Sequence, residues 1–363
     1  MTRLEALVGL NLTFDIGSIR LNKLLEYFGT PENILNAPLE RLSKVYGIGK
    51  NISSGIKSIG QKNIDKEFEA AKKLDIRIIS QDDADYPLNL KNIFDPPIVL
   101  YVKGKFQEED NLSIAIVGSR HASYYGLSSA ERFAQGLSAW GFTIVSGMAR
   151  GIDTYAHKGA LKQGGRTIAV MGSGFKHIYP EENKKLAEEI VNNGAVISEF
   201  PLDAQPLRQN FPRRNRVISG LSLGTLVVEA AKNSGALITA DFALEQGREV
   251  FALPGKVDSG TSFGPNELIK QGAKLVSCAD DIIEEFNFKA QGCVQKKSAP
   301  EAFSSGLANQ EAILYEAIAS GPLDLDEIIE KTHLDITSIS SMLLALEMKK
   351  LIRQLPGKQF IRN

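Results

Sequence analysis

Residues 113–286 alternate between strand-like and helix-like patterns, which predicts an α/β fold built on a doubly wound, mostly parallel sheet. Six short apolar runs mark the expected strands, at residues 114–117, 143–145, 167–170, 195–197, 226–228 and 250–252. Apolar strands between amphipathic helices are typical of a sheet with both faces covered. Two β-branched runs, at residues 76–79 and 98–102, precede them and indicate extra strands. The sequence therefore predicts an extended Rossmann-like core over residues 75–286.

A helical region precedes this core. Apolar positions recur at intervals of three and four over residues 4–74, with breaks at Gly17, at Gly29-Thr30-Pro31 and at Ala37-Pro38. Inside it, residues 42–52 have the form of a helix-hairpin-helix turn, in which two glycines would let backbone N–H groups approach a phosphate. The same turn also serves simply to join two packed helices, and both interpretations stay open. We predict an all-helical domain over residues 1–74.

Two segments follow the core. Residues 287–309 mix lysine, serine, proline and glycine with little periodicity, which is typical of a flexible linker. Residues 310–363 show three short helical segments and then a hairpin around Pro356-Gly357, which predicts a winged-helix domain. This last domain has eight acidic residues against six basic ones, so its charge argues against strong DNA binding. A duplex-DNA regulator that reads sequence through the winged helix is therefore a weaker hypothesis.

The composition limits where the protein acts and what it binds. A formal net charge of −1 excludes a globally basic nucleic-acid-binding surface, so a polyanion would need a local patch. Cys278 and Cys293 have neither metal-ligand spacing nor a disulfide framework around them, which indicates a reducing compartment. The first ten residues lack a secretion signal, and no stretch approaches the roughly 18 apolar residues of a membrane span. We expect a cytoplasmic protein without membrane, metal or cofactor sites.

The loops at the carboxyl ends of the expected strands carry candidate binding residues, because ligands of open parallel sheets lie there. The first loop is Gly118-Ser119-Arg120, which combines a glycine that admits a ligand with a hydroxyl and a guanidinium that suit a phosphate. Later loops add Ser146, Gly147, Met148 and Arg150 after the second strand, and Gly235 and Thr239 after the fifth. We interpret Asp153 as the cap of the helix that follows the second loop. Together these positions predict a track for an anion.

Three arginines stand at the start of a predicted helix in the middle of the chain. They are Arg213, Arg214 and Arg216, with Asn215 among them and Pro212 suited to the first helical position. Because a helix N-terminus carries partial positive charge, arginines there repel it, and an anion is the natural partner. Pairing with carboxylates elsewhere on the protein is the alternative.

The loops lack the signatures of a nucleotide-dependent enzyme. The sequence has no phosphate-binding lysine loop, no Gly-x-Gly-x-x-Gly after the first strand, and no cluster of histidine and cysteine at metal-ligand spacing. Glu199 and Glu229 stand where a catalytic carboxylate would act, but neither has a matched acid or base, so we interpret both as structural or as hydrogen-bond acceptors. We therefore predict no catalytic residues.

The order of these motifs resembles the DNA processing protein A (DprA, Smf) family. The resemblance rests on four segments, namely 118–120, 146–153, 211–219 and 234–240, and extends over nearly the whole chain. It implies a helical N-terminal domain, an extended Rossmann core and a winged-helix tail. It also implies a protein that is not an enzyme. Members bind single-stranded DNA and load the RecA recombinase onto it in natural transformation, displacing or working beside single-strand binding protein.

The resemblance also implies site residues. It assigns DNA phosphates to Ser119 and Arg120, to the Gly147–Arg150 turn and to the three arginines. Several members have a basic residue where this chain has Glu181, which leaves Lys184 or Lys185 to supply that charge. A homodimer interface is implied at Asn266, Leu268, Ile269 and Leu275, although the three apolar residues would also suit a core.

One enzyme alternative uses the same fold. Gly224-Thr225 followed by Glu229 faintly resembles the motif of lysine-decarboxylase-like nucleotide hydrolases, which would make the chain a nucleotide N-glycosidase or phosphoribohydrolase. The spacing to the glutamate is one residue too long, and the Pro-Gly-Gly that precedes it in those hydrolases is absent.

Overall fold

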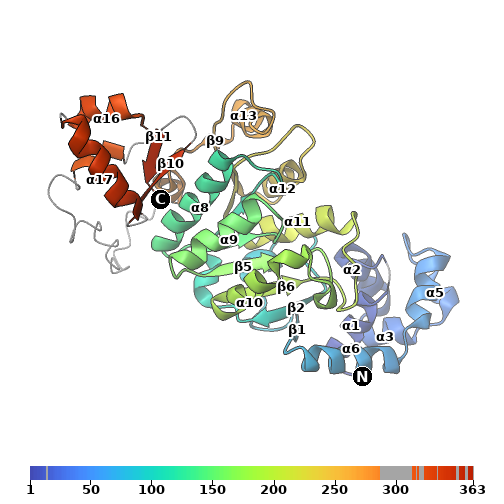
Figure 1. The fold of residues 1–363 in the computed structure, drawn as a ribbon. Helices are drawn as coiled ribbons and strands as arrows, with labels where there is room; N and C mark the ends of the chain where they lie inside the picture. Colours follow the sequence, from blue (N-terminus) through green and yellow to red (C-terminus); the bar gives the residue numbers. More distant parts are fainter. Residues whose placement is uncertain are drawn as a thin grey trace. The chain divides into compact units, whose positions relative to one another are not determined.

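The computed structural model describes residues 1–13, 15–286, 313–315, 317–318, 323–332, 334–348, 351–355 and 359–362 (Figure 1). The chain divides into two compact units, Met1–Val294 and Gln295–Asn363. The predicted linker, 287–309, lies outside the described residues. The domain boundaries at residues 74 and 309 stay predictions.

Six helices form before the first strand, as the apolar periodicity predicts. They are α1 (Arg3–Asn11), α2 (Ser18–Phe28), α3 (Pro31–Asn36), α4 (Leu39–Leu42), α5 (Lys50–Ser58) and α6 (Gln61–Lys73). The predicted breaks fall at helix ends: Gly17 precedes α2, Gly29 ends it with a φ of +80°, and Thr30 caps α3 by accepting a hydrogen bond from Asn33 N–H.

A nine-stranded sheet follows, in the order β1-β2-β6-β5-β4-β3-β7-β8-β9. Its strands are β1 (Arg77–Ser80), β2 (Val99–Gly104), β3 (Ser113–Val117), β4 (Thr143–Ser146), β5 (Thr167–Val170), β6 (Gly194–Ser198), β7 (Gly224–Val227), β8 (Glu249–Ala252) and β9 (Lys274–Leu275). Strand β2 pairs antiparallel with both β1 and β6, and all the other pairs are parallel. The prediction of a mostly parallel sheet is confirmed.

Helices cover both faces of this sheet (Figure 1). Alternate residues of β3 point to opposite faces: Ile114 and Ile116 pack in one apolar cluster, Ala115 and Val117 in another. The first cluster includes residues of α8 (Tyr124–Ala139), α9 (Ile152–Lys162) and α14 (Ala279–Glu285). The second includes residues of α7 (Leu88–Lys91), α11 (Asn210–Leu221), α12 (Gly235–Glu245) and α13 (Phe263–Lys270). This is the doubly wound arrangement that the sequence predicts.

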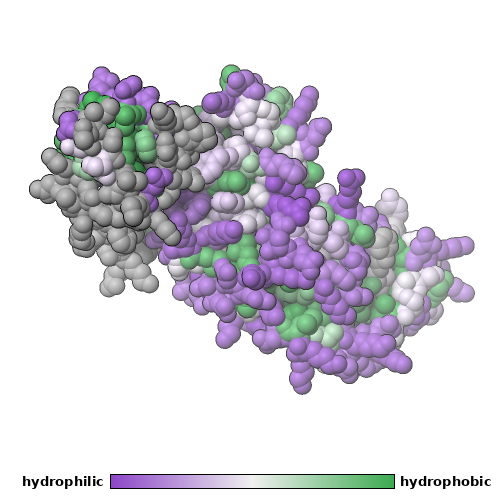
Figure 2. Space-filling view, viewed as in Figure 1, coloured by the Kyte–Doolittle hydropathy of each residue, from purple (hydrophilic) through white to green (hydrophobic). Residues whose placement is uncertain are grey.

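The N-terminal helices pack on the sheet edge beside α10 (Lys184–Asn192). One apolar cluster combines residues of α1 to α6 with Tyr101 of β2 and Val196 of β6. Two hydrogen bonds extend the contact: Asn11 Nδ2 donates to the Glu199 carbonyl oxygen at 3.1 Å, and Leu202 N–H donates to Glu67 Oε1 at 2.8 Å. On the outside, Figure 2 shows hydrophilic residues over much of the visible face of this unit.

The C-terminal unit has the elements of a winged helix. Helices α16 (Leu325–Thr332) and α17 (Ile336–Met348) precede an antiparallel hairpin of β10 (Ile352–Leu355) and β11 (Gln359–Arg362). Asp335 begins α17, because its carboxylate accepts a hydrogen bond from Ser338 N–H at 2.9 Å. A small apolar core joins the helices to the hairpin, with Ile328, Ile339 and Ile352 among its buried residues. The prediction of helices followed by a hairpin is confirmed.

Candidate nucleic-acid interface

The candidate site lies at the switch point of the sheet. From β3 the chain winds through β4, β5 and β6 to one side, and β7, β8 and β9 lie on the other side of β3. Near this switch point, the loops that leave the carboxyl ends of β3, β4 and β5, together with the start of α11, line one crevice. The predicted binding loops at residues 118–120 and 146–150 lie at this crevice.

The first two loops fit closely together. Gly151 has a φ of +75°, and a Cβ atom there would lie 2.2 Å from the Ser119 carbonyl oxygen. Ile152 N–H donates to that same oxygen at 3.2 Å, and Ser119 N–H donates to the Glu229 carbonyl oxygen at 2.7 Å. A side chain at position 151 would separate the loops, so the glycine is a requirement of this contact.

The turn after β4 is held from two sides. Met148 adopts a φ of +63° with its side chain fully buried, an uncommon conformation for a residue that is not glycine. Asn183 Nδ2 donates to the Met148 carbonyl oxygen at 2.8 Å, and Ala149 N–H donates to Asp153 Oδ2 at 3.2 Å. The interpretation of Asp153 as a helix cap is wrong, because α9 begins at Ile152 and the Asp153 carboxylate binds the preceding turn instead. Burial raises the pKa of Asp153, an effect that the Arg214 guanidinium opposes.

Arg214 and Arg216 both bind within the chain, but only Arg216 pairs with carboxylates, which is what the alternative interpretation of the arginine stretch held. Arg214 is buried, and its Nη1 donates to the carbonyl oxygens of Gly147 and Val170, while burial lowers its pKa to about 10. Arg216 is also buried and forms ion pairs with Glu199 at 2.5 Å and with Asp95 at 3.1 Å. Both side chains therefore support the crevice.

Arg120 and Arg213 are the more accessible arginines of the two segments. Arg213 is partly exposed, 3.2 Å from Glu199 and above the Phe200 ring. Arg120 is exposed, and its guanidinium lies 5.0 Å from the centroid of the Phe211 ring. Within the described residues, no carboxylate lies at ion-pair distance from Arg120. Its charge is thus available to an anionic ligand.

The other predicted cations differ in their surroundings. Arg150 forms a two-pronged ion pair with Glu182, both distances being 2.8 Å, on the exposed surface. Lys184 pairs with Glu181 at 2.7 Å. Its positive charge therefore offsets the negative charge of Glu181 before it can add to the charge of the site. Lys185 is exposed, and within the part of the chain that the structure describes it has no paired carboxylate.

These loops enclose a hollow of about 210 Å³. Its lining consists of Arg120, His121, Gly147, Ala149, Arg150, Tyr179, Pro180, Phe211 and Arg214. Tyr179 is half-exposed and its ring lies 5.8 Å from that of Phe211, so the hollow combines cations with an aromatic wall. The sequence prediction omitted His121 and Phe211 from the site. Phe211 lies two positions before Arg213, and this closeness to the arginines was the available signal.

Several predicted positions do not line the hollow. Ser146 is buried and its Oγ donates to the Ile116 carbonyl oxygen at 2.6 Å, and Thr239 is buried at 1% exposure. Gly235 accepts a hydrogen bond at its carbonyl oxygen from Asn215 Nδ2 at 3.0 Å, which joins α12 to α11. Pro212 is the third residue of α11 rather than the first, because the helix begins at Asn210; proline fits throughout the first turn, where N–H groups have no helical partner.

Glu229 is engaged in the start of α8. Its carboxylate accepts hydrogen bonds from Ser123 N–H at 2.8 Å and from Ser123 Oγ at 2.5 Å, and it is buried. Glu199 is likewise bound by arginines. Both glutamates act as acceptors inside the fold, which disfavours the nucleotide hydrolase alternative because its glutamate has to face a substrate.

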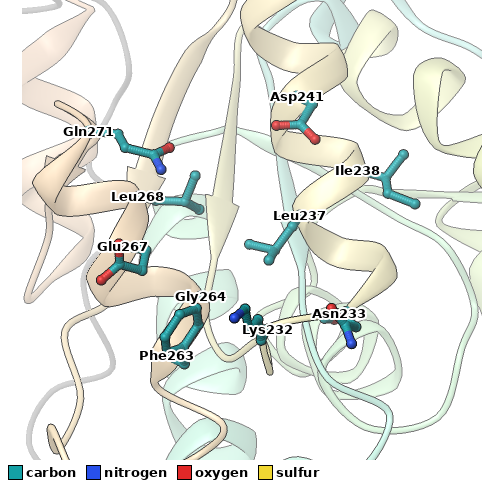
Figure 3. Close-up of a pocket in the computed structure, with 11 residues that line it drawn as sticks. Lys232, Asn233, Leu237, Ile238, Asp241, Phe263, Gly264, Glu267, Leu268 and Gln271 are labelled. Carbon is teal, nitrogen blue, oxygen red and sulfur yellow. The ribbon is translucent and has the colours of Figure 1, made fainter.

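The four positions predicted at a dimer interface lie on α13 and β9. Leu268 is buried and lines a second hollow, of about 390 Å³, where it lies with Leu237 between α12 and α13 (Figure 3). Asn266 exchanges two hydrogen bonds with the backbone of Gly255, and Ile269 is partly buried against the core. Leu275 is half-exposed, so of the four it is the one most open to a partner.

Comparisons with known proteins decide the family. A family model described as DNA recombination-mediator protein A matches residues 77–287. The chain belongs to the DNA processing protein A (DprA, Smf) family. A second model, described as the DprA winged helix domain, matches residues 297–358, in agreement with the helices and hairpin found there. Family membership assigns the chain to DNA processing and recombination.

Individual DprA and Smf proteins match over most of the chain. The Smf protein of Escherichia coli is 41% identical over 306 residues, which span 83% of this chain and 81% of that protein. The solved structure of DprA from Streptococcus pneumoniae superposes with a TM-score of 0.69 at 38% identity, covering 79% of this chain and 99% of that one. A structure of DprA from Helicobacter pylori, described for its single-stranded DNA binding mode, gives a TM-score of 0.52 at 30% identity over 58% of this chain and 95% of that one.

The described residues contain no helix that is long and apolar enough to cross a membrane. They also contain no group of three or more histidine, cysteine, aspartate or glutamate side chains placed to hold a metal ion.

Proposed function

We propose that this DprA-family protein binds single-stranded DNA at the switch point of its sheet and loads RecA onto the strand during natural transformation. The observation that carries the proposal is the hollow between the strand ends, where exposed Arg120 faces an aromatic wall with no carboxylate at ion-pair distance in the described part of the chain. Cations that follow phosphates, together with aromatic rings that accept unpaired bases, suit a single strand without regard to sequence.

The arginines have two different roles in this proposal. Arg120 and Arg213 contact DNA phosphates, whereas Arg214 and Arg216 hold the loops in place. Arg150 exchanges its exposed Glu182 partner for a phosphate when DNA binds, because exposed ion pairs are weak and readily replaced. Tyr179 and Phe211 offer ring faces to bases beside these cations.

The test measures binding of a labelled single strand and the matching duplex across a salt series. Arg120→Ala with Arg213→Ala is expected to weaken single-strand binding and to lower the slope of log K against log salt by about 0.7 for each phosphate that the variant no longer neutralises. Arg77→Ala is the control, because Arg77 begins β1, an outermost strand of the sheet, and pairs with Asp85. Equal binding by wild type and the double variant would place the DNA site elsewhere.

RecA loading is a separate step and needs its own assay. We expect the wild-type protein to shorten the lag of RecA filament formation on a single strand that is coated with single-strand binding protein. To do so, it would displace the single-strand binding protein or work beside it. The Arg120→Ala, Arg213→Ala variant should lose this effect in proportion to its loss of DNA binding. A variant that still shortens the lag without binding DNA would mean that RecA contact alone suffices. Since RecA acts on DNA in the cytoplasm, the proposal places the protein there.

Family resemblance further suggests that the protein works as a homodimer through α13 and β9. Leu275 of β9 is half-exposed, and it is the feature of this chain that supports such an interface. Two protomers would carry two DNA tracks. Once one track holds a strand, the second track would meet the same strand at a raised effective concentration.

A further inference from the structure

A basic surface lies on the N-terminal helices, outside the elements that form the strand-end hollow. Residues 41–64 contain five basic residues, at positions 41, 44, 50, 57 and 62, and no acidic residue. The whole chain, by contrast, has a net charge of −1. A local excess of one sign in a nearly neutral protein concentrates the field there and favours a ligand of opposite charge.

Tyr46 belongs to this basic segment, and 86% of its area is exposed. It belongs to the turn between α4 and α5, where Gly47 has a φ of +87° and the chain reverses. Lys23 of α2 places its Nζ 4.8 Å from the centroid of the Tyr46 ring. One ring face therefore meets a cation, and the exposure of the side chain leaves the other face open.

The lysines around Tyr46 are available to a ligand. Lys44 and Lys50 are exposed on either side of the turn. Across the described ranges, no carboxylate lies at ion-pair distance from Lys23, Lys44 or Lys50, whereas nearby Arg20 does have such a partner, Asp15, at 2.8 Å. Tyr27, on the same helix as Lys23, is half-exposed, and the Arg41 guanidinium lies 6.0 Å from the centroid of its ring. Two exposed rings, each beside a cation, repeat the chemistry of the strand-end hollow.

We propose that this surface is a second contact for single-stranded nucleic acid, in which Tyr46 stacks on an unpaired base and Lys23, Lys44 and Lys50 contact the flanking phosphates. The inference extends the proposed function, since the ligand is of the same class. A base inside a duplex offers no free face for stacking, so the exposed ring favours a single strand. An acidic protein segment would use the lysines and leave the ring unused.

The first experiment reports on position 46 directly. Trp140 is the single tryptophan of the chain, so Tyr46→Trp combined with Trp140→Phe leaves one tryptophan, at position 46, whose fluorescence can be excited selectively over that of the tyrosines. In this full-length variant we expect an oligo-dT strand to quench the fluorescence and an equal concentration of duplex to leave it unchanged. Unchanged fluorescence at saturating oligo-dT, or equal quenching by duplex, would overturn the proposal.

The second experiment compares affinities for oligo-dT. Tyr46→Ala should weaken binding about five-fold, the lower end of what stacking on an aromatic ring contributes, while Tyr46→Phe should bind like the wild type. Lys44→Gln with Lys50→Gln should lower the salt slope by about 1.4, or 0.7 for each lysine. Lys72→Gln with Lys73→Gln is the matched control, because it removes the same charge from exposed positions at the end of α6.

The outcomes separate this inference from the proposed function. If Arg120→Ala weakens binding but the variants at positions 44, 46 and 50 do not, the second contact is wrong and the strand-end site stands. If the wild type binds no single strand, both proposals fail. Quenching of the Tyr46→Trp, Trp140→Phe variant by polyglutamate but not by oligo-dT would overturn the inference and assign the surface to an acidic protein.

Discussion

Arg213 and Arg216 lie three positions apart on α11 and meet the same carboxylate, Glu199, whereas Arg214 points to a different side. Successive residues of a helix are rotated by about 100°, so neighbouring arginines cannot share one environment. The sequence pattern shows three cations in one turn, but only the packing of α11 decides which of them reaches solvent. This is why the candidate residues were predictable as a group and their separate roles were not.

Arg214→Ala should destabilise the fold strongly. The substitution leaves the carbonyl oxygens of Gly147 and Val170 without their donor and leaves buried Asp153 without its nearby positive charge. Such losses in a buried site cost about 3 kcal/mol. Urea unfolding would measure the change, with Arg213→Ala as the comparison, which we expect to cost about 0.5 kcal/mol because Arg213 is partly exposed. Equal costs for the two variants would contradict the assignment of roles.

His157 should make the stability depend on pH. The hydroxyl of Thr167 donates to the Ile144 carbonyl oxygen and so accepts from His157 Nδ1 at 2.7 Å, which leaves Nε2 bare in the core. Burial lowers the His157 pKa from 6.5 to about 3. The unfolded chain therefore binds the proton first, so the stabilisation is complete above about pH 6.5 and is lost as the pH falls toward 3.

The check is urea unfolding of the wild type and of His157→Gln between pH 7 and 5. Below pH 6.5 the wild type should lose up to about 1.4 kcal/mol per pH unit more than the variant does. His121→Gln, at an exposed position, should keep the wild-type dependence. The explanation fails if the His157→Gln protein loses stability with the same slope.

At the scale of single elements, the contact between the first two loops should depend on Gly151. Gly151→Ala forces a Cβ against the Ser119 carbonyl oxygen, which displaces the loop that carries Arg120. Gly164 also has a positive φ, of +71°, but nothing lies within 4 Å of a Cβ there. Alanine at 164 thus adds backbone strain alone. We expect both variants to lose about 1 kcal/mol from strain, and only Gly151→Ala to lose most of its single-strand binding as well. Anisotropy titrations measure the difference, and similar binding by both would contradict the role of this contact.

The predicted strands agree with β1 to β8 to within about two residues, because the buried strands form short apolar runs between helices, whereas the two-residue strand β9 was not predicted. The hydrogen bonds of the turns were harder to predict from the sequence than the strands. Asp153 looked like a cap, yet its carboxylate binds the turn before α9, since the positive φ of Met148 directs the Ala149 N–H toward it. The sequence alone does not reveal a backbone conformation of this kind at a methionine. His121 and Phe211 were missed because they belong to separate segments of the chain, which only tertiary packing brings to one hollow.

At the scale of the whole molecule, the proposed dimer is testable through Leu275. Leu275→Glu places a charge on a half-exposed position of β9, where burial against a second copy would make it unfavourable. We expect sedimentation to show a monomer at concentrations where the wild type is dimeric. Leu88→Glu, at an exposed position on α7, should leave the assembly unchanged. A wild type that is monomeric at high concentration would remove the dimer from the proposal.

The two edge strands of the nine-stranded sheet have a consequence for aggregation of the protein. The outermost strands are β1, with four residues, and β9, with two. Unpaired strand edges are the usual starting points for fibril growth, and these two offer little backbone to another chain. High local protein concentrations, such as those reached when many molecules crowd onto one long polymer, should therefore not convert the folded protein into cross-β aggregates.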